Sequence, residues 1–425
     1  MTHQSYKISY AALLLIFSVS PLACAQETAP NSSGPLGANV KELLDWANQH
    51  NPDLQALRRE AEAKEQSVQT ADSLDDPVFR MELQGIDKNN PDLSPSNVSS
   101  TKYTILQSFP VWGKLDLRRD IARAEWSEAK ARGEIVRAEL FAQIKAAYAM
   151  FYQTRRAAEI SRENVQLVNS LEKVAQARYI NGVAPQQDLI RIKIEQTKLR
   201  SELLTLESEQ HHARTRLNLM LNRPSFAALV EPKELRPLPA VLDAPTLEQR
   251  LLAHSPYLAT QSSQIEIAEK NRQLAGKNRY PDLTLGISPI QRGNSIDSWD
   301  AMLEIKIPLH QGDRSADNRS ASLQLGAAQD RQQSILNQIE GSFREAFDAL
   351  GSARIQVSLL KNSLLPQSEL TFQSALSGYQ TGKLDFITLL DAQFLVKQTR
   401  LELLKALVEQ DNRLSEVERL LGEEL

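Results

Sequence analysis

The segment SWDAMLEIKIP, residues 298–308, alternates apolar and polar side chains. On a strand, Trp299 and Leu303 would share one face and Glu304 and Lys306 the other, because strand side chains point to opposite faces in turn. Three further segments alternate in the same way: 78–85, 101–110 and 282–290. Alternation over about 8 to 10 residues is typical of a membrane β-barrel strand with one apolar and one polar face. Isolated hairpins on a soluble core would show it too, so the context of these segments decides.

The four segments lie at equivalent places in a duplicated chain. The matching pairs, each near 200 positions apart, are Pro77 and Pro281, Phe109 and Ile307, Tyr179 and Tyr379, and Gly182 and Gly382. An offset this long indicates a duplication and not a short-period solenoid. In each half the sequence predicts, in order, a helix, a strand, a loop, a strand, a long helix, a tight turn and a helix. We place the first structural repeat at residues 26–245 and the second at residues 246–425.

The helices predicted in both repeats are too long for a globular domain. In the first repeat, residues 112–177 keep a helical pattern over about 66 residues, which is about 100 Å at 1.5 Å per residue. The neighbouring helices, 41–74 and 186–221, are each about half that length, so that stacked end to end they match it. The second repeat has the same proportions, with helices expected at 247–277, 314–376 and 385–421. Apolar spacings of three, four and seven residues within them indicate coiled coils. We therefore expect a mainly α fold with a small β part, in which residues 223–245 form a belt between the repeats.

The first 25 residues have the layout of a secretory signal peptide. Lys7 precedes an apolar run, Ile8–Val19, that is too short to cross a bilayer as a helix, and small residues follow it. Two processing routes compete. One is cleavage after Ala25, which we favour, and the other is lipidation of Cys24 within an imperfect lipoprotein motif. Because Cys24 is the only cysteine, cleavage would leave a mature chain without disulfides or thiolate metal ligands.

The composition narrows the function classes. Charged residues recur every few positions from Lys41 onward, so we expect no transmembrane helix after the signal. The formal net charge of −4 argues against nucleic acid as a partner. No nucleotide-binding, catalytic-triad or metalloenzyme motif is present, and we expect neither an enzyme nor a cofactor. His211 and His212 are adjacent on a helix and would point roughly 100° apart, so we expect no metal site there.

Four strands predict an oligomer. An open strand edge would leave unpaired amides in hydrocarbon, and the smallest single-chain bacterial barrels have about eight strands. Two chains would supply eight strands, a barrel filled by its own side chains, whereas three would supply twelve and enclose a lumen. We therefore expect a homotrimer in outer-membrane lipid. The loops at 86–100 and 291–297 would face outside, and the Tyr-x-x-Gly turns would lie at the far, periplasmic tip.

Three motifs can be compared with known families: RYING at 178–182 followed by Asp188, YQTG at 379–382, and GK at 113–114. With the duplication, they resemble the TolC family of outer-membrane efflux proteins over essentially the whole mature length. The resemblance implies a trimer with a twelve-stranded outer-membrane barrel and a periplasmic helical tunnel. It also implies a periplasmic adaptor protein that docks at the tip and an inner-membrane RND pump. Chain length and the GK motif look most like the branch that serves heavy-metal pumps.

The resemblance also assigns the candidate site residues. The expected adaptor-docking residues at the tip are Arg178, Tyr179, Gly182, Asp188, Tyr379 and Gly382. Three aspartates, Asp188, Asp385 and Asp391, could form carboxylate rings that narrow the tip and favour cations. They could equally cap the helices that begin there. The second tip has Thr388 where the first has Asp188, so the two tips need not bind the adaptor equivalently.

Three other interpretations stay open. A drug-efflux or type I secretion duct would have the same fold, and the sequence does not identify the cargo. A periplasmic adaptor usually has a single helical hairpin inserted in a small β-domain, which nothing here matches. A soluble coiled-coil structural protein would explain the heptads, but not two alternating hairpins at duplicated positions.

Overall fold

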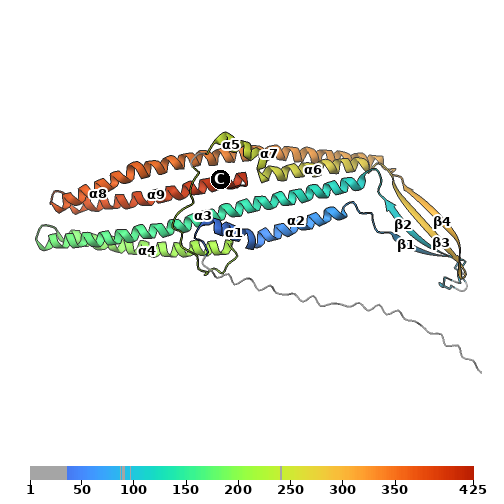
Figure 1. The fold of residues 1–425 in the computed structure, drawn as a ribbon, viewed down its shortest axis with the longest axis horizontal. Helices are drawn as coiled ribbons and strands as arrows, with labels where there is room; N and C mark the ends of the chain where they lie inside the picture. Colours follow the sequence, from blue (N-terminus) through green and yellow to red (C-terminus); the bar gives the residue numbers. More distant parts are fainter. Residues whose placement is uncertain (1–35, 87, 89–90, 96, 240–241) are drawn as a thin grey trace, which may run out of the picture. The chain divides into compact units, whose positions relative to one another are not determined.

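The computed structural model describes residues 36–86, 88, 91–95, 97–239 and 242–425. The predicted signal peptide, residues 1–25, and the candidate lipidation site Cys24 lie outside these residues. One compact unit spans Pro35–Leu425. Figure 1 shows its helices side by side and its strands together in one sheet.

The sheet has a strand in each of the four expected segments. The strands are β1 Val78–Gln84, β2 Ser100–Phe109, β3 Asp282–Arg292 and β4 Ser295–Lys306, in the order β1-β2-β3-β4. Every neighbouring pair is antiparallel. The loop predicted at 291–297 is wrong, because β3 and β4 run on through most of it to a two-residue turn at Gly293 and Asn294. Gly293 has φ 59°, which a tight hairpin of this kind needs and glycine adopts without strain.

The register separates an apolar face of the sheet from a polar one. Ile105 lies opposite Phe79 on one side and Ile287 on the other. The exposed apolar side chains of this face are Phe79, Met81, Ile105, Leu285, Ile287, Trp299, Leu303 and Ile305. On the opposite face the Thr104 and Ser288 hydroxyls are hydrogen-bonded at 2.9 Å. A sheet whose face is in contact with water rarely exposes so many large apolar side chains.

The helices of the first repeat are α1 Val40–His50, α2 Pro52–Thr70, α3 Lys114–Ile180 and α4 Gln186–Met220. The long helix α3 has 67 residues, as the sequence predicts to within a few residues. The single helix predicted at 41–74 is wrong. Asn51 interrupts it, because its side chain accepts hydrogen bonds from the N–H groups of Asp53 and Leu54 and so starts a second helix.

The second repeat has the helices α5 Ala244–His254, α6 Pro256–Lys277, α7 Gln311–Leu359, α8 Leu365–Gln380 and α9 Phe386–Leu421. The single helix predicted at 247–277 is likewise wrong, because it breaks at Ser255. The helix predicted at 314–376 continues to Gln380, and a π-helical turn, Leu360–Leu364, separates α7 from α8. Such turns interrupt α-helices rarely, and often at functional sites.

The two breaks are built alike and join the stacked short helices. The Asn51 side-chain amide donates to the Met220 carbonyl at the end of α4, at 3.0 Å. The Ser255 hydroxyl donates to the Leu420 carbonyl at the end of α9, at 3.3 Å. Each side chain thereby satisfies a helix-terminal carbonyl that would otherwise lack a partner. The duplication therefore extends to individual hydrogen bonds.

Helix α3 is the centre of the packing. It contacts α2 and α4 of its own repeat, and also α6 and α9 of the second repeat, which in turn pack on α7. Because α3 begins just after β2 and ends at the first Tyr-x-x-Gly turn, its length of about 100 Å separates the sheet from that turn. Among the described residues, no helix has the length and apolar character needed to cross a membrane.

In the belt predicted at residues 223–245, Arg236 is held by buried charges. The Arg236 guanidinium donates to Asp411 Oδ1 at 2.7 Å and to Glu418 Oε2 at 2.6 Å. Lys145 of α3 also reaches Glu418 Oε2, at 2.8 Å. Asp411 and Glu418 are each 4% exposed, so both carboxylates depend on these cations to replace water.

Candidate functional site

The first Tyr-x-x-Gly turn ends α3 with a regular helix-stop geometry. Gly182 has φ 70°, and its N–H donates to the Tyr179 carbonyl at 2.9 Å. The N–H of Val183 donates to the Arg178 carbonyl, also at 2.9 Å. This pair of bonds is a Schellman motif, in which a left-handed residue lets the chain turn back over the last helical carbonyls. Glycine adopts that conformation without a Cβ clash.

The second turn repeats this geometry at the end of α8. Gly382 has φ 76°, its N–H donates to the Tyr379 carbonyl at 3.1 Å, and the N–H of Lys383 donates to the Gly378 carbonyl at 2.8 Å. Gly378 stands where the first turn has Arg178. A Cβ on Gly378 would lie 2.6 Å from Leu384 Cδ1, so the absence of a side chain lets Leu384 fold over the turn.

Three of the sequence-predicted residues meet between the two turns. The Arg178 guanidinium carbon lies 4.4 Å from the centroid of the Tyr379 ring. The Tyr379 hydroxyl donates a long hydrogen bond, 3.5 Å, to Asp188 Oδ2. Burial raises the pKa of Asp188, against the opposing effects of the Tyr379 hydroxyl and the Arg178 charge. Burial and the Asp188 charge also raise the pKa of Tyr379. We refer to Arg178, Tyr379 and Asp188 as the tip triad.

The tip triad adjoins an apolar core that joins the two helical hairpins. Tyr379 is 2% exposed and its ring centroid lies 5.3 Å from that of Phe386. The buried residues of this core are Val168, Leu171, Ala175, Ile192, Leu199, Phe372, Ala375, Tyr379, Phe386, Leu389 and Ala392. They come from α3, α4, α8 and α9, whose ends are seen together in Figure 1. Tyr179, the equivalent of Tyr379, is outside this core and 43% exposed.

The three candidate aspartates have different surroundings. Asp385 caps α9, since Oδ1 accepts from the Thr388 N–H at 3.0 Å and from the Thr388 hydroxyl. These bonds lower the pKa of Asp385. Asp188 does not cap α4, whose N-cap is Pro185, and instead belongs to the tip triad. The Asp391 side chain is exposed, and its carboxylate makes no hydrogen bond or ion pair within the described part of the chain.

A groove between α4 and α9 contains residues that sequence reasoning missed. Its volume is about 510 Å³, and Asp391 lines it together with Ile194 and Phe394. These two apolar side chains are 50% and 53% exposed. They occupy equivalent positions in the two repeats, so the offset that identified the turns could have identified them too.

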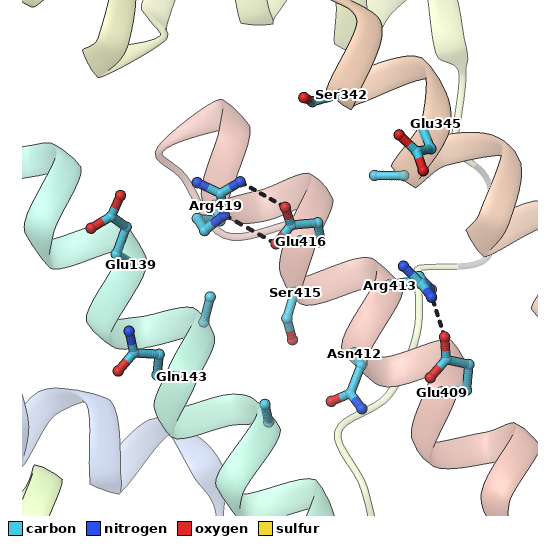
Figure 2. A pocket seen from close by; sticks show the side chains of 13 residues that line it. Glu139, Gln143, Ser342, Glu345, Glu409, Asn412, Arg413, Ser415, Glu416 and Arg419 are labelled. Atoms are coloured by element: carbon cyan, nitrogen blue, oxygen red, sulfur yellow. Dashed lines mark hydrogen bonds and ion pairs between the residues drawn. The ribbon is translucent and has the colours of Figure 1, made fainter. Parts of the chain in front are cut away.

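A larger groove of about 650 Å³, seen in Figure 2, lies between α3, α7 and α9. Its carboxylates on α9 are paired, Glu416 with Arg419 at 2.6 Å and Glu409 with Arg413 at 2.6 Å. Across the described residues, no group of three or more His, Cys, Asp or Glu side chains is arranged to hold a metal ion. His211 is hydrogen-bonded to Arg214 at 2.8 Å.

Comparison with known proteins places this geometry in a family. The family model described as outer membrane efflux protein matches residues 43–223 and 247–423. The cobalt-zinc-cadmium resistance protein CzcC of Cupriavidus metallidurans is 23% identical over 394 residues, which cover 92% of this chain and 91% of CzcC.

Two solved structures have the same fold. That of CusC, described for its folding and transmembrane channel formation, has a TM-score of 0.75 at 19% identity and covers 90% of this chain and 92% of CusC. The outer membrane protein VceC of Vibrio cholerae has a TM-score of 0.74 at 17% identity, with 91% and 96% covered. The family match spans most of both repeats and agrees with the resemblance drawn from the turn motifs. The chain belongs to the outer membrane efflux protein family.

Proposed function

We propose that the protein is the outer-membrane exit duct of a tripartite efflux system, in which three copies pass heavy-metal cations from periplasm to exterior. The duct conducts passively and catalyses no reaction. An inner-membrane RND pump supplies the driving force, and a periplasmic adaptor joins the pump to the tip. The helices stand in the periplasm and the strands in the outer membrane.

The observation that carries this proposal is the sheet. One face exposes large apolar side chains such as Trp299, which is 63% exposed, while the other is lined by hydroxyls and charges. Within the described residues β1 pairs only with β2, and β4 only with β3, so two strand edges are open. Lipid satisfies the apolar face but not the open edges. Pairing β4 of one copy with β1 of the next satisfies the edges, and three copies give a ring of twelve strands wide enough for a polar lumen.

Heavy-metal cations are the proposed cargo because the relative that matches nearly the whole chain is named a cobalt-zinc-cadmium resistance protein. The absence of a tight metal cluster in the described residues suits a duct, since conduction needs weak, repeated contacts from which ions leave readily. The test is a bacterial strain that lacks its own duct but has a metal-exporting pump and adaptor. Expression of this chain should restore growth in zinc or cadmium. Unchanged sensitivity, with trimers present in the outer membrane, would exclude this cargo.

At the tip, we assign the cation-selective aperture to Asp391. Asp385 serves as a helix cap and Asp188 belongs to the tip triad, whereas the Asp391 carboxylate is exposed and has no partner among the described residues. The other charged residues that line the same groove are three cations and two carboxylates: Arg191, Lys198, Lys397, Glu195 and Glu202. In each copy Asp391 would have to outweigh the one positive charge by which these cations exceed the carboxylates. Threefold symmetry would gather the three Asp391 carboxylates around the axis.

Single-channel recordings in planar bilayers test this assignment. Asp391→Asn should lower the cation preference of the pore, because it removes three charges from the aperture. Asp385→Asn is the matched control, since asparagine caps a helix as well as aspartate does and the same charge is lost from a position outside the aperture. Equal cation preference in both variants and the parent would exclude an aspartate aperture at 391.

The adaptor would dock beside the two glycine turns, as the candidate residues Gly182 and Gly382 suggest. Ile180 and Val183 flank the first turn and are 74% and 63% exposed, an apolar surface that a helical hairpin of the adaptor could cover. Val183→Asp should abolish metal tolerance while trimers persist, and Gln187→Asp, also on the surface, should leave it intact. Full tolerance with Val183→Asp would place docking elsewhere.

A further inference from the structure

The two helical hairpins at the tip have similar backbones, but each hairpin buries the side that is exposed on the other. The first hairpin consists of α3 and α4 and the second of α8 and α9, with the same turn geometry 200 positions apart. Within the chain, one side of the first hairpin packs against one side of the second. The buried residues of this contact include Leu171 and Asp188 from the first hairpin and Phe372, Tyr379 and Phe386 from the second.

The equivalents of these five residues have no such cover. Thr371, Thr388 and Gln186 are exposed, Glu172 is half-buried and Tyr179 is 43% exposed. They divide between two surfaces. Thr371 and Thr388 lie on the second hairpin, on the side that corresponds to Leu171 and Asp188 of the first hairpin. Glu172, Tyr179 and Gln186 lie on the first hairpin, on the side that corresponds to Phe372, Tyr379 and Phe386 of the second hairpin.

This inference rests on the proposed trimeric duct. Three copies place six hairpins in a ring, in which first and second hairpins alternate. Each first hairpin then touches its own second hairpin on one side and the second hairpin of the neighbouring copy on the other. Because the hairpins are alike, the contact between copies should reuse the geometry of the contact within a chain.

We propose that Tyr179 of each copy packs against Thr388 and Gly378 of the neighbouring copy, in the position that Tyr379 occupies against Asp188 and Arg178 within the chain. We refer to this contact as the intersubunit seam. The Thr388 hydroxyl donates to Asp385, and its oxygen keeps lone pairs free to accept from a tyrosine hydroxyl. Gly378 has no side chain to cover the ring, and Leu384 of the same chain lies over Gly378.

The intersubunit seam differs chemically from the contact within the chain. Where the tip triad has a cation on the aromatic ring and a carboxylate at its hydroxyl, the seam has a glycine and a threonine. Where Phe372 and Phe386 add apolar area within the chain, the seam has Glu172 and Gln186. Each copy therefore keeps its own hairpins together by apolar burial, and Tyr179 is the large apolar side chain that the seam contributes.

Site-specific cross-linking tests the seam. In the contact within the chain, Tyr379 meets Asp188 with its far end, so their backbones are too distant for a disulfide, which needs Cα atoms within about 7 Å. A short bismaleimide can bridge two cysteines placed there. Tyr179→Cys with Thr388→Cys should yield covalent dimers and trimers on a denaturing gel. Tyr379→Cys with Asp188→Cys, the matched pair within the chain, should migrate as a monomer after the same treatment.

Two controls separate the possible failures. The parent chain, whose only cysteine is Cys24, sets the background. Native mass measurement of each double variant in detergent shows whether three copies are assembled. Trimers in which the 179/388 pair yields no covalent dimer, or is bridged within one chain, would overturn the seam and leave the proposed duct intact. A monomeric parent protein would overturn both.

Discussion

Replacing Arg236 by alanine should destabilise the helical part of the protein more than the loss of a surface arginine. The Arg236 side chain donates to Asp411 Oδ1, Glu418 Oε2 and the Ser415 hydroxyl, at 2.7, 2.6 and 2.8 Å. Without it, Glu418 would keep its ion pair with Lys145 at 2.8 Å, and Asp411, which is nearly fully buried, would lose its ion-pair partner among the described residues. Removing one partner from a buried ion network costs about 3–5 kcal/mol, because the remaining charge has lost both its partner and its water.

The expected change is measurable by thermal unfolding. At about 2.1 cal/mol/K of unfolding entropy per residue over the compact unit, this loss lowers the midpoint by about 4–6 °C. The helical circular-dichroism signal of the detergent-solubilised protein reports it. Arg413→Ala is the matched control, because its partner Glu409 is 48% exposed and such pairs contribute about 0–1 kcal/mol.

The effect of Arg236→Ala should shrink at acidic pH. Burial already raises the pKa of Asp411 in the folded protein, and Arg236 opposes that rise, so its removal raises the pKa further. A carboxyl whose folded pKa lies above its unfolded value favours folding where it is protonated and loses that contribution as pH rises through the folded pKa. The difference from the parent protein should therefore narrow between about pH 7 and about pH 4. Equal shifts for Arg236→Ala and Arg413→Ala at pH 7 would refute the buried network as a source of stability.

Three further substitutions have defined outcomes. Gly378→Ala should lower the midpoint of thermal unfolding, because the added Cβ would lie 2.6 Å from Leu384 Cδ1. An unchanged midpoint would mean that Leu384 moves aside at no cost in stability. Asn51→Ala should cost about 1–2 kcal/mol in thermal unfolding, since it removes the cap of α2 together with the bond to the end of α4, and a neutral result would contradict that double role. Leu303→Lys, on the apolar face, should cost each copy about 2–4 kcal/mol in lipid and reduce outer-membrane trimers on heated gels, whereas Glu304→Lys on the polar face should not. Equal trimer yields would contradict the assignment of faces.

The pattern of the chain predicted the elements that depend on local sequence. Period-two alternation located the strands, and the Tyr-x-x-Gly motif located both turns at the tip to within a few residues. The breaks at Asn51 and Ser255 were missed although each precedes a proline, because helical periodicity continues through both. The loop at 291–297 was overestimated, since a two-residue Gly-Asn turn needs no more chain.

The candidate site depended on contacts that no local pattern contains. Tyr179 and Tyr379 have the same motif around them, yet one is exposed and the other buried, because only Tyr379 meets the cation and carboxylate of the opposite hairpin. The capping interpretation describes Asp385, where a threonine three positions on completes the cap. It does not describe Asp188, whose partner lies 191 positions away in sequence.

The proposed duct requires that the four strands of each chain form a closed ring only with those of other copies. Native mass spectrometry of the detergent-purified mature protein measures this directly. We expect a mass of three chains that persists on dilution in detergent, with precipitation when detergent is removed. A single-chain mass, from protein that stays dissolved without detergent, would contradict the proposed duct.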